Sequence, residues 1–347
     1  MKTSSISTLA IVNATRETRT NLQAKLVEAQ KESSTGRYAD VGLTLGYLTQ
    51  RTVSLRQDYD RAQTFKDSNI VASSRLDLTQ TTLDGMASSA QEFLTTLMAA
   101  RASPTAAGTA ITDAKNKLTS FEAALNTTVN GTHIFSGVNT DVKPISSYFT
   151  TPPSAAQTAT STALSNYMTA QSIPSIGDMT GAQMDAFLNG DFANLFADPN
   201  WANWSSASDQ NITSRISTNE RIETSTNANE GPFRALAQAY TMIADLGVQN
   251  LNSEAYQAVV NKAIEIVGQA SADLTQLRAG LGTAEERISD ANNRMDLQMN
   301  LLKEHIGQLE NVDPYEATAK VNGLLVQIET AYALTARLQN LTLLNHI

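Results

Sequence analysis

The most regular hydrophobic pattern in the chain lies between Leu48 and Ala100. In alternating steps of three and four residues, twelve of sixteen positions are apolar. This spacing keeps the apolar side chains on one face of a helix. It predicts one helix of roughly 80 Å, ended by Pro104.

A second pattern of the same kind runs from Leu274 to Val312, where ten of twelve positions are apolar, and Asp313-Pro314 closes it. Shorter amphipathic stretches at 111–129 and 255–266 predict two further helices. Each apolar face needs a partner. We therefore expect a mainly α protein, an elongated antiparallel helical bundle.

The composition changes between residues 144 and 214. This segment has no Lys, Arg or Glu, but it holds five Asp, five of the eight prolines and both tryptophans. We interpret it as an inserted small β-containing domain of short strands and turns, placed at the tip of the rod. One helical stretch is expected in it, with a shared apolar face of Met184, Phe187, Leu188, Phe192, Leu195 and Phe196.

Each end of the chain predicts one more amphipathic helix. The N-terminal seam consists of Leu22, Leu26 and Ala29, before a break at Gly36. Isolated helices of this kind are marginal in water, so we expect both to become ordered only in an assembly. The seam of the C-terminal helix, which begins after Pro314, consists of Leu324, Ile328, Ala331, Leu334, Leu338, Leu341 and Leu344.

These patterns predict five segments along the chain. Residues 1–43 and 314–347 are terminal assembly helices, and 144–214 is the insert. Residues 44–143 and 215–313 are the two halves of the helical rod.

Composition narrows the function. The net charge of −9 and the absence of a basic patch argue against nucleic acid as a partner. The C-terminal helix carries Lys320 and Arg337 without Trp or Phe, which favours packing on protein over a membrane surface. There is no cysteine, and the N-terminus lacks the apolar region of a cleaved signal peptide. These features fit a cytoplasmic chain or one exported unfolded.

Isolated polar residues suggest little chemistry. We interpret His133 as structural, His305 as a residue that sets register in the second rod helix, and His346 as unimportant. The tryptophans are expected to form the core of the insert rather than a carbohydrate platform. We predict no catalytic residue, metal site or cofactor, and so no enzyme. The recurring Asp178, Asp185, Asp191 and Asp198 lack the closing Glu of a calcium loop.

The phrase GTHIFSGVNTDVKPI, residues 131–145, resembles the segment after the rod helices in the hook-filament junction proteins of the bacterial flagellum, also called hook-associated protein 3. The first rod helix and the C-terminal helix are similar to those of the wider flagellin superfamily. In the C-terminal helix, Thr342-Leu343-Leu344 corresponds to a Ser-Leu-Leu phrase, while His346-Ile347 departs from the usual aromatic-leucine end. The junction phrase matches at Gly131, Ile134, Phe135, Ser136, Gly137, Thr140, Asp141 and Pro144.

The resemblance implies terminal helices paired as a coiled coil inside a tube. It implies unfolded export through the flagellar type III channel to the extracellular flagellum, without a cleaved signal peptide. Implied partners are further copies, the adjacent hook-associated junction protein, flagellin, and a cytoplasmic export chaperone that covers the C-terminal helix, including Leu343. The implied role is the junction between hook and filament, on which flagellin assembles. Two alternatives stay open: a flagellin, and an exported enzyme with its activity in the insert.

Overall fold

The computed structural model describes the backbone of residues 8–344 and the side chains of residues 10–337 except 12 and 104. Its contacts divide the chain into two compact units. Unit 1 consists of Met1–Thr64 with Arg294–Ile347, and unit 2 is Phe65–Asn293. The boundaries between these units fall inside two long helices, so the five predicted segments stay a prediction.

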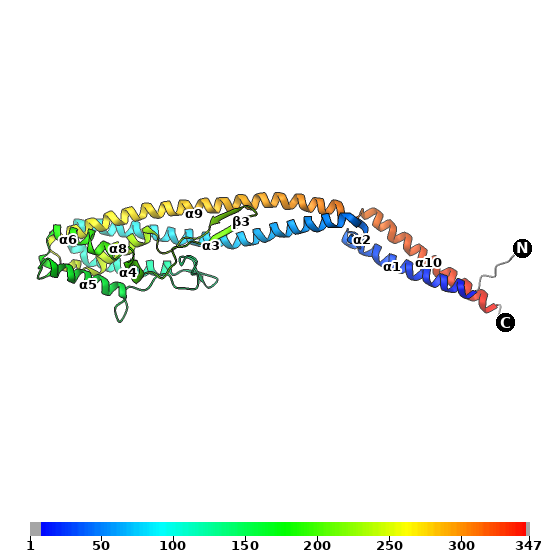
Figure 1. Cartoon of the computed structure of the whole chain (residues 1–347), viewed down its shortest axis with the longest axis horizontal. Helices are drawn as coiled ribbons and strands as arrows, with labels where there is room; N and C mark the ends of the chain where they lie inside the picture. Colours follow the sequence, from blue (N-terminus) through cyan, green and yellow to red (C-terminus); the bar gives the residue numbers. More distant parts are fainter. Residues whose placement is uncertain (1–7, 345–347) are drawn as a thin grey trace. The chain divides into compact units, whose positions relative to one another are not determined.

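Two long helices form the framework of unit 2. They are α3 (Thr49–Ala102) and α9 (Ser253–Glu310), which run side by side there (Figure 1). Asn69 Nδ2 donates to Asn292 Oδ1 at 2.8 Å, and Tyr256 Oη donates to the carbonyl of Ala100 at 2.9 Å. Because the positions increase on one helix as they decrease on the other, the pair is antiparallel. This confirms the predicted mainly α, antiparallel architecture.

The predicted seam of α3 is confirmed over its second half. Every seam position from Asn69 to Ala100 is buried. On α9 the prediction needs two corrections. The predicted stretches 255–266 and 274–312 lie in one continuous helix, which Gly268 does not interrupt and which ends at Glu310, before Val312. After Met295 the buried face continues through Met299, so Gln298 and His305 are exposed, and His305 sets no register.

A second helical layer covers part of α3. It contains η2 (Pro104–Ala106), α4 (Ala107–Leu125), α8 (Gly231–Asp245) and η5 (Val248–Asn250). Tyr240 of α8 lies between the rings of Phe93 and Phe121, with centroids 5.1 and 6.0 Å away. The predicted helix 111–129 is observed as α4, which begins and ends four residues earlier, and α8 was not predicted.

Two short hairpins lie between helices of unit 2, the first after α4 and the second before α8. In the first, β1 (Thr128–Val129) pairs antiparallel with β2 (Thr132–His133). Its turn residues Asn130 and Gly131 have φ of 50° and 79°, as a tight two-residue hairpin requires. In the second, β3 (Thr213–Ser217) pairs antiparallel with β4 (Glu220–Glu223), with an irregularity between Arg215 and Ser217.

Residues 144–212 are mostly helical, which corrects the expectation of short strands. Ser154 and Thr180 cap α5 and α6 by accepting hydrogen bonds from the backbone of the first turn. The tryptophans form the core, as predicted, because Trp201 and Trp204 are each 2% exposed and stack at 5.8 Å. The elements are α5 (Ala155–Ala170), η3 (Ile176–Asp178), α6 (Gly181–Asn189), α7 (Asp191–Asn194) and η4 (Asn200–Asn203).

Candidate functional site: the paired terminal helices

The two terminal helices pack on each other within unit 1. They are α1 (Thr8–Thr35) and α10 (Pro314–Leu344), side by side and antiparallel (Figure 1). Gln23 Nε2 donates to Tyr332 Oη at 3.1 Å, and Lys320 Nζ donates to Glu32 Oε2 at 2.9 Å. The short α2 (Val41–Leu45) and η1 (Gly46–Leu48) then connect α1 to α3.

The predicted seams largely face this pairing. Ala29 is fully buried, and Leu22 and Leu26 are half-buried. On α10, Leu324 and Ile328 are buried and Ala331 is half-buried. Leu334 is 51% exposed and lies outside the buried part of this pairing, so its assignment to the assembly surface stays a prediction. Leu338, Leu341, Leu343 and Leu344 lie on the helical backbone of α10, but their side chains are outside the described residues, as are His346 and Ile347.

Unit 1 leaves many large apolar side chains in solvent. Among the described side chains, eleven of the seventeen exposed large hydrophobic residues belong to this unit, although it is the smaller one. Exposed apolar surface concentrated in this way is typical of a surface that binds protein. These residues are Val27, Leu43, Tyr47, Val53, Leu297, Leu301, Tyr315, Leu325, Val326, Tyr332 and Leu334.

Polar contacts fix how the helices pair. The Lys320 ammonium lowers the pKa of the Glu32 carboxyl chiefly through their hydrogen bond, and the backbone N–H of Ala39 adds a second bond of 3.3 Å. The guanidinium of Arg19 lies over the Tyr332 ring, 5.3 Å from its centroid. The Lys320–Glu32 and Arg19–Tyr332 contacts join the two helices at separate positions along their length, so they favour one register between α1 and α10.

The junction phrase lies in unit 2 and has a structural role. Phe135 is fully buried, with its ring 5.6 Å from that of Phe233, and its carbonyl accepts from the N–H of Ala228 at 2.8 Å. Gly137 has φ of +62°, and a Cβ there would lie 2.5 Å from the carbonyl oxygen of Ser208. Only glycine fits this close approach. The phrase therefore fastens residues 131–144 to segments near 208 and 228.

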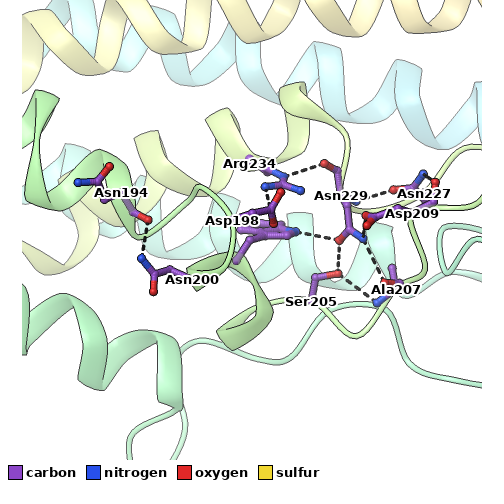
Figure 2. A network of polar contacts seen from close by, with 10 residues as sticks. Asn194, Asp198, Asn200, Ser205, Ala207, Asp209, Asn227, Asn229 and Arg234 are labelled. Atoms are coloured by element: carbon purple, nitrogen blue, oxygen red, sulfur yellow. Dashed lines mark hydrogen bonds and ion pairs between the residues drawn. The ribbon is translucent and has the colours of Figure 1, made fainter.

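A polar network supports the same region (Figure 2). The side chain of Asn229 accepts from Trp201 Nε1 at 2.9 Å and donates to the carboxylate of Asp209 at 2.7 Å. Arg234 donates to the backbone carbonyl of Asn229 at 2.7 Å and pairs with Asp198 at 3.1 Å. These polar contacts join the turn at Asn229 to the insert, so the cluster has a structural role. Asp198 takes part in it through Arg234 although its side chain is 76% exposed.

The other residues of the phrase are also placed by the structure. His133 is half-buried, and its Nδ1 lies 3.1 Å from the carbonyl of Asn126, which fits the structural interpretation. Ile134, Ser136 and Pro144 are buried, whereas Asp141 is exposed. The N–H of His133 donates to the carbonyl of Thr140 at 2.7 Å, which closes the loop between them.

Sequence reasoning missed the charged residues at the C-terminal end of α9. Glu310 is 1% exposed, and its carboxylate accepts hydrogen bonds from both Arg37 and Arg56. Hydrogen bonding to Arg56 is the main reason that the pKa of Glu310 is lowered, and Arg37 adds to it. The helix breaks at Gly36 and Pro314 can be recognised in the sequence and mark where the helices end. They do not indicate the ion pairs of Glu310.

The described residues contain no group of three or more His, Cys, Asp or Glu side chains placed to hold a metal ion. Among the helices that can be described, none is both long and apolar enough to cross a membrane.

Comparisons with known proteins agree with this arrangement. Residues 6–140 match the bacterial flagellin N-terminal helical region, and residues 264–347 match the bacterial flagellin C-terminal helical region. No curated protein matches the chain in sequence. A solved structure from Vibrio parahaemolyticus, provisionally assigned as a flagellar hook-associated protein, is similar in fold, with a TM-score of 0.52 at 9% identity over 76% of this chain and 97% of that one. With both terminal regions of a flagellin in their order along one chain, the protein belongs to the flagellin superfamily and is a structural component of the bacterial flagellum.

Proposed function

We propose that the chain is the subunit of the junction between hook and filament and forms the platform on which flagellin assembles. The observation that carries this proposal is the phrase 131–144, which resembles hook-associated protein 3 and whose residues 134–137 and Pro144 are buried in unit 2. The fold shared with a protein assigned as hook-associated supports it. The proposed role requires no catalysis.

The proposal includes specific partners. The α1–α10 pair meets further copies of the chain, and other surfaces meet the adjacent hook-associated protein and flagellin. The chain is exported unfolded through the flagellar type III channel without a cleaved signal peptide, and a chaperone covers α10 beforehand. The exposed apolar residues of unit 1, among them Val326 at 61% and Leu334 at 51%, support this, since such side chains gain from being covered.

The test is electron microscopy of cells that lack the gene, with flagellin measured in the spent medium. We expect bare hooks and flagellin lost to the medium, both reversed by the wild-type gene supplied in trans. Normal filaments on the deletion strain, in a genome with no second copy, would refute the proposal.

A flagellin is the second candidate function. The matched family regions favour it, because both are described as parts of flagellin. Antibody labelling of intact flagella separates the two functions. A junction subunit is labelled only in a short zone next to the hook, whereas a filament subunit is labelled along the whole filament.

A further inference from the structure

The connection from α1 toward α3 and the connection from α9 to α10 are both non-helical, and the two lie next to each other. α1 ends at Thr35, α9 ends at Glu310, and α10 begins at Pro314. The interruptions, residues 36–40 and 311–313, are called the joint below. Two backbone hydrogen bonds cross it, from Tyr38 N to Glu310 O and from Val312 N to Gly36 O, each 3.0 Å.

The backbone at the joint breaks the helix in both passages of the chain. Gly36 has φ of +69° with open space where a side chain would be, and it ends α1. Pro314 has no N–H to continue the ladder of α9, and it restricts the residue before it. Neither passage can therefore continue as one unbroken helix.

A pocket of about 390 Å³, open to solvent, lies beside the joint within unit 1. On this side the joint is not surrounded by a close-packed interior, so it has less steric support there. The residues that line the pocket are Arg37, Arg56, Tyr59, Asp60, Lys303, Ile306, Gly307, Glu310 and Asn311.

Ion pairs hold the joint on the side where side-chain packing does not. The Glu310 carboxylate is buried and accepts from Arg37 in the joint and from Arg56 on α3, with Arg56 Nε at 2.9 Å. Glu310 is also the last residue of α9, where the partial negative charge of the helix end disfavours an anion. The carboxylate is therefore favourable there only while both guanidinium groups face it.

We propose that Glu310 is a latch. While it holds both Arg37 and Arg56, the α1–α10 pair keeps one orientation relative to the first turns of α3, and when it is released the pair turns about the joint. This is a property of the folded chain, and it is independent of whether the chain forms junction or filament.

The latch is sensitive to acid. Arg37 and Arg56 contact Glu310, and the other titratable groups that line the pocket beside it are Tyr59, Asp60 and Lys303. The folded pKa of Glu310 is lowered, so its stabilisation is present above the ordinary carboxyl pKa and is lost as the pH falls through the folded value. The arginines stay charged throughout. Release therefore follows protonation of Glu310.

The absence of cysteine makes the movement measurable with spin labels on the full chain. One cysteine replaces Val27 on α1, and a second replaces Val53 on α3, both exposed and both in unit 1. Pulsed electron spin resonance then gives the distance distribution between the labels. It is recorded for the labelled parent, for Glu310→Gln, and for Glu304→Gln, an exposed carboxylate on the same helix.

We expect one narrow distribution for the parent and the Glu304→Gln control at neutral pH. Glu310→Gln is expected to shift and broaden it at unchanged helix content by circular dichroism. Acid is expected to do the same to the parent and to Glu304→Gln, which both keep Glu310, and to change Glu310→Gln no further. Arg37→Gln, which leaves the Arg56 pair, is expected to give an intermediate broadening. An unchanged distribution in Glu310→Gln would overturn the latch, and so would a loss of helix content, because Glu310 would then be needed for folding.

Discussion

Lys320 on α10 donates a 2.9 Å hydrogen bond to Glu32 on α1, although the two residues are 288 positions apart in the chain. The Glu32 side chain is 11% exposed and that of Lys320 is 51% exposed, so water screens the pair from one side. The bond joins the first and last helices of the chain. It is therefore a direct probe of their pairing.

Replacing Lys320 with Ala should destabilise the α1–α10 pair by about 0.5–1 kcal/mol, because the ion pair is half-exposed. A double-mutant cycle with Glu32→Ala, followed by thermal unfolding, measures the coupling. Because the pKa of Glu32 is lowered, the coupling is present at neutral pH and disappears as the pH falls through the folded value. Lys25→Ala, an exposed lysine on α1, is the control. Additive effects of the two substitutions would contradict the contact.

Gly137→Ala should destabilise unit 2 by about 2 kcal/mol or more, through both backbone strain and steric overlap. Its φ is +62°, and the new Cβ would lie 2.5 and 2.6 Å from two carbonyl oxygens. Gly131→Ala is the matched control, with φ of +79° but nothing within 4 Å of its Cβ, and should cost only about 1 kcal/mol of strain. Urea unfolding of both variants decides. Equal losses would mean that the overlap at Gly137 is relieved.

The junction phrase shows what sequence reasoning could reach. Its glycines mark backbone positions that a pattern can identify. The apolar period of α3 predicts the face that is buried from Asn69 to Ala100, against α9 and the layer that contains α8. The same reasoning missed α8, although its sequence has a helical period. Phe233, Leu236 and Tyr240 share a buried face, and the polar side chains on its half-buried face are Arg234, Gln238 and Asp245.

The structure of the insert and the ion pairs at the joint could not be predicted from the sequence, for different reasons. In α5 only Ala156 and Thr160 are buried, so local capping by Ser154 determines the helix and the apolar pattern is weak. The contact between Arg56 and Glu310 spans 254 positions. Neither residue belongs to a periodic pattern, so a single sequence does not indicate that these two side chains are in contact.

Glu122→Gln should make unit 2 more stable at pH 8, by something of the order of 1 kcal/mol. Glu122 is 7% exposed, and burial raises its pKa, so its ionised form carries a penalty that grows as the pH rises through the folded pKa. Gln keeps the oxygen that accepts from the N–H of Tyr148 at 2.9 Å. Below the ordinary carboxyl pKa the two proteins should have the same free energy of unfolding.

Glu92→Gln is the control, because its expected change in the free energy of unfolding at pH 8 has the opposite sign. The exposed Glu92 pairs with Lys117, and its pKa is lowered by that hydrogen bond. Its stabilisation is present above the ordinary carboxyl pKa and lost in acid, so the variant should be the less stable protein at pH 8. Urea unfolding across the pH range measures both. If Glu122→Gln were also less stable at pH 8, the ionised carboxylate would be required there, contrary to the burial argument.

Leu334→Asp should prevent assembly and leave the folded chain intact, because Leu334 is 51% exposed on α10 and outside its buried seam. Ile328→Asp should behave differently. Its side chain is 9% exposed, so a charge there would be buried between α1 and α10 and should lower the melting temperature as well. Thr330→Asp adds the same charge at an exposed polar position of the same helix and should preserve both properties. Circular dichroism measures folding, and electron microscopy of complemented deletion cells measures assembly; filaments on cells carrying Leu334→Asp would show that this side chain meets no partner in the flagellum.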